Sequence, residues 1–273
     1  MFFTSEIVAQ NIQGVATYKT QRKVNIELDS TQFNDEMMQR MQAMLKKQFE
    51  RTYTLDFTDS ESVYKEEESL ESPGNTVNSG GMVVMVAGAG GNDVLYKNLK
   101  ENRYANQTEV FSKQFLIKDV LEQPEWTLTK ETKNIGNYTC FKATYMRTTR
   151  VMSSVSSSDG SDDTEETTDE EVEQEVTAWY TPQIPVKNGP GQYGGLPGLI
   201  LEASDGSETI LCSKIVLNPK DGVSIKEPTK GKVVNDEEYE KILEEKMKEM
   251  NERYQTDGRR GDRSHRMNVR IGG

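Results

Sequence analysis

The stretch that decides the fold is dense in glycine and proline and runs directly into three apolar residues. It reads Gly189-Pro190-Gly191-Gln192-Tyr193-Gly194-Gly195-Leu196-Pro197-Gly198-Leu199-Ile200-Leu201-Glu202. Glycine and proline mark turns, and a short apolar run after them is typical of a buried strand. The pattern therefore predicts a sharp turn that feeds a core strand. A binding loop at the end of a sheet is the alternative interpretation, but turn geometry is the commoner use of such residues.

The dipeptide Asp205-Gly206 follows this strand and separates it from a second apolar run, 210–212. Asp-Gly between two apolar runs predicts a hairpin with a two-residue type I′ turn. Counting outward from that turn pairs Leu201 with Ile210. The same count places Cys212 on a central strand of the sheet that carries the motif.

Alternating apolar residues predict further strands towards the amino terminus. The pattern has period two at 24–28 and 53–57, and residues 96–150 are predicted to form a β-meander in which Phe111, Phe115 and Ile117 mark one strand. Residues 72–93 are rich in Gly, Val and Met, which predicts a mobile insertion or an edge strand. The glycines there are not followed by the Lys-Ser/Thr of a phosphate-binding loop.

Two segments carry the apolar stripe of an amphipathic helix. The first spans 34–50, with Asn34 as its predicted N-cap, and the second runs from Asn235 to about Tyr254. The stripe of the first helix consists of Met37, Met38, Met41, Met44, Leu45 and Phe49. A methionine face is soft and adaptable, so it suits either an apolar ligand or the closing of a core.

Charge is concentrated in one segment of the chain. Residues 153–176 contain ten acids and no Lys or Arg, and removing these ten charges from the net charge of −12 leaves −2. Segment 153–175 is therefore predicted to be a disordered hairpin insertion, and the Gly/Arg-rich residues 255–273 a disordered basic tail. The acidic segment lacks the spacing of a preformed Ca²⁺ site, and we expect no nucleic-acid partner.

Few residues are available for catalysis or metal binding. The single histidine, His265, lies in the predicted tail, so a histidine-based triad or metal site is not expected in the core. A hydrolase built on two carboxylates stays possible but has no sequence support. Cys140 and Cys212 could form one disulfide or could be two buried strand residues. We expect no cofactor, no metal and no enzymatic activity.

Three blocks in order resemble the GLPGLI family of proteins. They are Tyr138–Thr144, Ala178–Pro185 and the motif Gly195-Leu196-Pro197-Gly198-Leu199-Ile200, from which the family takes its name. Asn137 replaces a usual glycine, and the insertions and the tail depart from the family pattern. The resemblance implies an exported protein of Gram-negative bacteria, periplasmic or associated with the outer membrane, whose activity is not established.

Residues 1–10 resemble the end of a signal peptide, with Ile7-Val8-Ala9 before a cleavage point at Gln10. We expect either a signal-peptide remnant or a disordered terminus there. No apolar run in the chain reaches the length of a membrane span.

The fold class expected from these patterns is mainly β, within a single domain at 11–254. A curved antiparallel sheet or half-barrel would enclose the methionine-rich helix, with a C-terminal helix packed on it. This order of elements resembles bacterial half-barrel carriers of lipoproteins. The expected function is to bind or carry an apolar lipid or peptide in a groove lined by Met37, Met41, Met44, Leu45, Leu199 and Leu201. The alternative is a structural or assembly partner in the cell envelope without a small ligand.

Overall fold

The computed structural model describes residues 12–22, 24–26, 50–67, 76–79, 82–85, 93–155, 166–257 and 269–271. The methionine-rich segment 27–49, the first eleven residues and His265 lie outside these ranges. The strands in chain order are β1 (Gly14–Arg22), β2 (Val24–Ile26), β3 (Arg51–Phe57), β4 (Glu61–Glu66), β5 (Thr76–Ser79), β6 (Met82–Met85), β7 (Val94–Asn98), β8 (Arg103–Val110), β9 (Lys113–Val120), β10 (Thr127–Ile135), β11 (Tyr138–Val155), β12 (Glu166–Thr181), β13 (Leu199–Ser204), β14 (Glu208–Leu217), β15 (Lys232–Val234) and β16 (Val269–Ile271). Helix α2 spans Asp236–Asp257.

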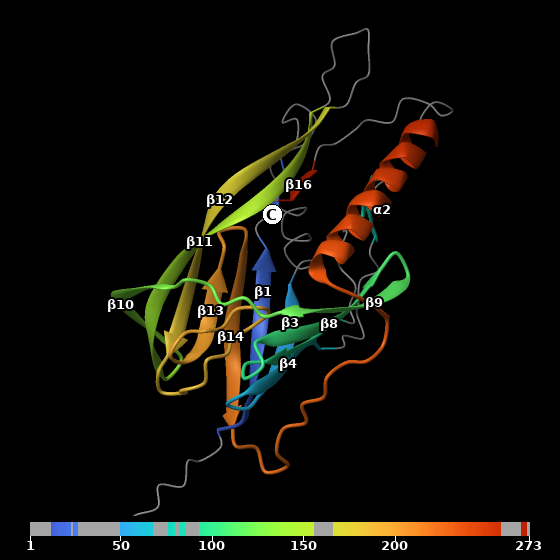
Figure 1. The fold of residues 1–273 in the computed structure, drawn as a ribbon. Helices are drawn as coiled ribbons and strands as arrows, with labels where there is room; N and C mark the ends of the chain where they lie inside the picture. The colour runs from blue at the N-terminus through green and yellow to red at the C-terminus, as the bar shows by residue number, and fades with distance from the viewer. Residues whose placement is uncertain are drawn as a thin grey trace, which may run out of the picture.

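Twelve strands form one curved sheet in the order β10-β11-β12-β13-β14-β1-β3-β4-β7-β8-β9-β15 (Figure 1). All neighbours are antiparallel except β15, which runs parallel to β9. Residues 96–150, predicted to form one β-meander, instead form two antiparallel runs towards opposite ends of the sheet, β7-β8-β9 and β10-β11. The mainly β class with a C-terminal helix is confirmed. The sheet is therefore mixed rather than purely antiparallel.

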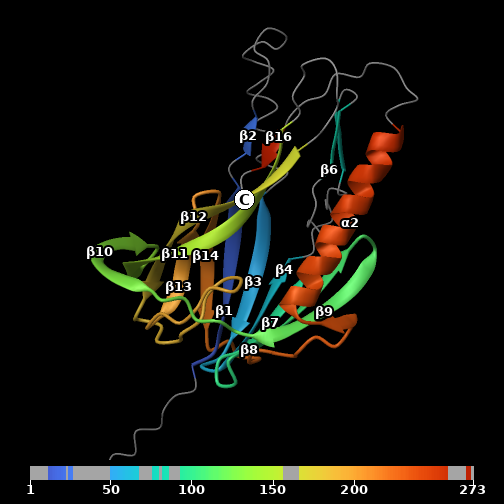
Figure 2. The ribbon, with the colours of Figure 1, turned by 45° about the horizontal axis from the view of Figure 1, so that its top comes forward.

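The main core lies on one face of this sheet, which we call the inner face. Inward residues of β1, β3, β7, β9 and β13 meet Ile184 and Val186 of the loop before the motif, and Tyr239 and Ile242 of α2. Figure 2 shows α2 standing beside β9 at one edge of the sheet. A smaller cluster around Tyr96 and Leu116 lies on the other face, where Ile225 of the loop between β14 and β15 packs against it.

Helix α2 begins where the sequence predicted. The Asn235 side chain accepts a hydrogen bond from the Glu238 backbone N–H at 2.8 Å, and the Glu238 carboxylate accepts one from the Asn235 N–H at 3.3 Å. This reciprocal capping box satisfies two amide groups that have no partner within the helix. The ring of Tyr239 then packs edge-on against Phe115 of β9, with 5.5 Å between the ring centroids.

The predicted hairpin around Asp205-Gly206 forms, but its predicted register is wrong. Ile210 pairs with Ala203 instead of Leu201, a shift of two residues that keeps every side chain on its face. The reason is local, because the Asp205 carboxylate accepts hydrogen bonds from the backbone N–H groups of Ser207 and Glu208. Strand β14 begins at Glu208, and the Asp205 N–H donates to the Glu208 carbonyl, so the turn is centred one residue later than predicted.

The acidic segment is more ordered than predicted. Residues 145–155 of β11 pair with residues 166–176 of β12, and this two-stranded arm continues past the ends of the neighbouring strands β10 and β13. Composition alone suggested disorder here, but a ladder anchored at the buried Val176 extends outward by pairing backbone groups. Residues 156–165 lie outside the described structure.

Two other predicted loop or tail regions contain strands. β5 and β6, within the 72–93 insertion, pair with each other as a separate two-stranded sheet instead of forming the predicted edge strand. β16 falls within residues 255–273, which were predicted to be disordered, and it pairs with β2. Alternation of Val269 and Ile271 around Arg270 is the short strand pattern that the charge of this tail obscured.

Gly198 is the residue of the motif with the least space around it. A Cβ atom at this position would lie 2.2 Å from the backbone oxygen of Thr181. Overpacking of this kind costs roughly 1–3 kcal/mol. We therefore expect Gly198→Ala to lower the free energy of unfolding by about 2 kcal/mol in urea denaturation.

Gly194→Ala is the matched control in the same loop. Its Cβ would meet only one atom, the Lys187 carbonyl oxygen at 3.2 Å, and its φ is not positive. A smaller loss is expected for this variant, and equal losses in the two variants would contradict the packing explanation.

Candidate functional site

The motif Gly195–Ile200 is part of the core and not an open binding loop. Leu196, Leu199, Ile200 and Leu201 are all at most 1% exposed. A partner outside the loop helps to hold it in place, because the Trp126 indole N–H donates to the Gly194 carbonyl at 2.8 Å. This placement agrees with the turn interpretation of the Gly/Pro-rich stretch.

The Tyr18 hydroxyl is the second partner of the motif strand, and it donates to the Ile200 carbonyl at 2.7 Å from a fully buried position. Only two of the residues predicted to line a groove belong to the described structure. Leu199 and Leu201 lie in the main core, whereas Met37, Met41, Met44 and Leu45 fall outside the described residues.

Lys97 of β7 clamps the loop that precedes the motif. Its ammonium group is fully buried and donates to the carbonyl oxygens of Gly189 at 2.8 Å, Gly191 at 2.7 Å and Tyr193 at 3.0 Å. Burial lowers the pKa of Lys97 to about 7, whereas three carbonyl acceptors match the three N–H donors of the charged form. The group is fully engaged by the loop, so its role here is to hold the backbone.

The two cysteines are free thiols and do not form the possible disulfide. Both belong to the main core, Cys140 on β11 and Cys212 on β14. Burial raises the pKa of Cys140 to about 11 and that of Cys212 to about 12, so neither is a thiolate at neutral pH. They are apolar core residues in this structure.

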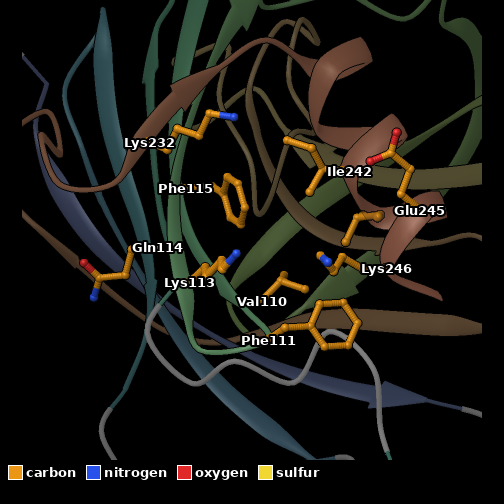
Figure 3. Close-up of a pocket in the computed structure, with 10 residues that line it drawn as sticks. Val110, Phe111, Lys113, Gln114, Phe115, Lys232, Ile242, Glu245 and Lys246 are labelled. Atoms are coloured by element: carbon orange, nitrogen blue, oxygen red, sulfur yellow. The ribbon is translucent and has the colours of Figure 1, made fainter. Parts of the chain in front are cut away.

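A groove of about 510 Å³ lies between the turn that joins β8 to β9, strand β15 and helix α2 (Figure 3). Its apolar lining comes from Val110, Phe111, Phe115, Ile242 and Leu243. Its polar lining comes from Lys113, Gln114, Lys232, Glu245 and Lys246. In Figure 3 the Phe115 ring lies in the middle of the lining, whereas Gln114 points away from it.

An uncommon turn shapes the mouth of this groove. Phe111 and Ser112 connect the paired residues Val110 and Lys113, and their φ angles are +51° and +60°. Two residues with positive φ make a type I′ turn, a position that favours Asn or Gly and disfavours a bulky side chain. The Phe111 ring is nevertheless 43% exposed at the groove. Backbone strain that places an apolar ring at an opening is typical of functional positions.

The third side of the groove depends on Gly231, which has a φ of +114°. A Cβ atom there would lie 2.6 Å from the Phe115 carbonyl carbon, so only glycine lets β15 approach β9 so closely. The next residue, Lys232, pairs with Phe115 across the parallel ladder. This approach brings the Lys232 side chain into the groove.

The rim of the groove is positively charged. Lys246 forms an ion pair with Glu249 one helical turn further along α2. Lys113 and Lys232 make no ion pair within the part of the chain that the structure describes. With three lysines and one glutamate, the groove presents an apolar floor beneath a cationic edge, which suits an anionic amphiphile.

Sequence patterns did not reveal this groove. Phe111 was predicted to lie within a strand, but it occupies the turn. The prediction failed because the stretch 110–113 lacks the Gly or Asn by which such turns are recognised. Lys97 offered one usable signal, a charged residue at an inward position of an otherwise apolar strand. The lysines of the groove come from three separate elements, so no local pattern connects them.

Other chemistry has little support among the described residues. No group of three or more His, Cys, Asp or Glu side chains in them could hold a metal ion. Within the same residues, no helix is long and apolar enough to cross a membrane.

Comparison with known proteins gives a partial family match. A family model described as "Protein of unknown function (Porph_ging)" matches residues 126–202, a span that contains all three sequence blocks described above. No curated protein matches the chain in sequence. Two solved structures of PNGF-II, in space groups C2 and P21, are similar over 84% and 86% of this chain, with sequence identities of 15% and 16% and TM-scores of 0.45 and 0.46. This chain spans about a third of the length of PNGF-II, 32% and 33% in the two cases.

Replacing Lys97 by methionine tests the clamp. Lys97→Met leaves the three loop carbonyls without their donor in the interior, and each unsatisfied buried group costs roughly 1–3 kcal/mol. We expect the free energy of unfolding, measured in urea, to fall by about 3 kcal/mol or more. The exposed Lys100→Met is the control and should change stability by less than about 0.5 kcal/mol. Equal urea midpoints for both variants would contradict the clamp.

Proposed function

We propose that this chain is a non-enzymatic binding protein whose groove holds a single-chain anionic amphiphile, that is, one alkyl chain with a carboxylate or phosphate head. The observation that carries the proposal is the exposed Phe111 ring, held at positive φ at the mouth of the groove. The strained turn costs free energy that glycine or asparagine at this position would largely avoid. A role for the ring outside folding accounts for that cost.

The lining of the groove supports this choice of ligand. A volume of about 510 Å³ falls within the range of roughly 300–1,000 Å³ that is usual for small-molecule sites. Phe115 and Ile242 offer apolar contact for a chain, while Lys113 and Lys232 offer donors for an anionic head. The proposed ligand is still the apolar ligand expected from the sequence, but its site moves to the edge of the sheet beside α2.

The cellular setting is part of the same proposal. The match to the family model over residues 126–202 and the three sequence blocks support membership of the GLPGLI family. With that membership we propose an exported protein, periplasmic or associated with the outer membrane. An amphiphile that carries a lipid chain is a ligand that such a compartment supplies.

Binding of laurate, measured by isothermal titration calorimetry, tests the proposal. Laurate should bind, and dodecyltrimethylammonium, which has the same chain length and the opposite charge, should bind at least about tenfold more weakly. Reversing two rim charges in Lys113→Glu/Lys232→Glu should weaken laurate binding by about tenfold, equivalent to ~1.4 kcal/mol. The exposed Lys130→Glu on β10 is the control and should bind as the wild type does.

Phe111→Asn separates binding from folding. Asparagine suits positive φ better than phenylalanine, so the melting temperature should stay the same or rise while laurate affinity falls. Equal binding of both detergents, or an unchanged laurate affinity in Phe111→Asn, would count against the groove. A protein that binds neither would favour the alternative, an assembly role without a small ligand.

A further inference from the structure

A row of polar side chains crosses the inner face and ends at Thr108, which pairs with the groove residue Phe115. Tyr53 of β3 and Glu66 of β4 are direct partners across the antiparallel ladder. The registers of β4 with β7 and of β7 with β8 continue this row to Asp93 and then to Thr108. Side chains directly opposite one another in neighbouring strands are close enough to interact. Four strands thus bring a phenol, two carboxyl groups and a hydroxyl side by side.

Tyr64 belongs to the same cluster and has an unused hydroxyl group. It lies on the same face as Glu66, two residues earlier on β4, and its ring stacks on that of Tyr53 with 4.8 Å between centroids and 8° between planes. The side chain is only 8% exposed, yet its hydroxyl has no hydrogen-bond partner. Burial first, and then the charges of Tyr53, Glu208 and Glu66, raise the pKa of Tyr64 well above its ordinary value. Buried hydroxyl groups without a partner are uncommon in folded proteins, and a bound donor would satisfy this one.

The carboxyl groups around these tyrosines are incompletely compensated. Glu66 forms an ion pair with Arg51 at 3.1 Å, and Glu208 lies opposite Arg22 in the ladder of β14 and β1. Asp93 has no ion pair within the described part of the chain, and its Oδ1 atom is buried without a hydrogen-bond partner. One negative charge therefore has no counterpart.

The hydroxyl group of Tyr53 senses the charges of these carboxyl groups. After burial, the charges of Glu66, Glu208 and Asp93 raise the pKa of Tyr53, whereas Arg51 lowers it. Burial likewise raises the pKa of Glu66, Glu208 and Asp93, the last to about 6. Hydrogen bonds from Thr108 and from the Glu109 backbone oppose the shift of Asp93 without cancelling it.

We propose that the cluster of Tyr53, Tyr64, Glu66, Asp93 and Glu208 binds a primary ammonium group, such as that of an alkylamine or a lysine side chain. The Asp93 Oδ1 atom and the Tyr64 hydroxyl oxygen are free acceptors for its N–H donors. The stacked tyrosine rings add the attraction of a cation for aromatic faces. An organic cation fits better than a metal ion, because these carboxyl groups do not form a metal-holding set within the described residues.

Butylammonium chloride is the probe for this site, in calorimetric titration of the full chain at pH 7.5. Butylammonium should bind, and butyrate, with the same chain and the opposite charge, should not. Asp93→Asn should weaken butylammonium binding at least about tenfold, whereas Glu122→Gln, which removes an exposed carboxylate elsewhere, should leave it unchanged. Equal affinity for both probes, or an affinity unaffected by Asp93→Asn, would overturn the proposal.

The melting temperature of Asp93→Asn, compared with that of the wild type, distinguishes a loss of binding from a loss of folding. The pKa of Asp93 is raised from 3.8 to about 6 in the folded protein, so the folded state holds its proton more tightly than the unfolded chain does. The stability that this contributes is complete below about pH 4 and is lost as the pH rises through 6. Asp93→Asn should therefore melt at the wild-type temperature at pH 4 and above it at pH 7.5, provided that Glu66, Glu208, Arg51 and Tyr239 titrate alike in both proteins. A variant that melts lower than the wild type at pH 7.5 would overturn the view that Asp93 is uncompensated.

Discussion

The ammonium group of Lys97 holds the conformation on which the centre of the sheet depends. Loop 182–198 crosses the inner face, and a buried loop must pair its carbonyl oxygens without help from water. Lys97 supplies donors to three of them from β7, which four strands separate from β13 in the sheet order, and it brings two segments about ninety residues apart into fixed contact. With the loop in place, Ile184 and Val186 complete the core, and the strand that follows enters the sheet at Leu199.

The molecule carries local strain and uncompensated charge at different places. Phe111 occupies a backbone conformation that asparagine or glycine would adopt more easily, and Asp93 keeps a carboxyl group where burial opposes its charge. Neither feature stabilises the fold. Proteins commonly concentrate such costs at sites of function, which is why these two positions, and not the Gly/Pro-rich motif, direct the functional proposals.

Sequence patterns succeeded where a feature is local. The capping box at Asn235 and the helical stripe after it were predictable, because a helix is stabilised by neighbours three and four residues apart. The hairpin at Asp205-Gly206 was predictable, but its register was not, since the Asp205 carboxylate binds the N–H groups of Ser207 and Glu208 and the turn is centred one residue later. Composition predicted that the first part of β12 would be disordered. That prediction failed because backbone hydrogen bonds to β11 order this segment despite its polar side chains.

The amino-acid sequence by itself determined the β class, the buried motif strand and the C-terminal helix, because periodicity and turn residues act over a few positions. The tertiary structure alone decided which side chains meet. The groove joins a turn, a parallel strand and a helix from residues 110 to 246, and the tyrosine–carboxyl cluster combines residues of β3, β4 and β14 with Asp93. Contacts of that range depend on strand order and pairing, and no local pattern of residues encodes them.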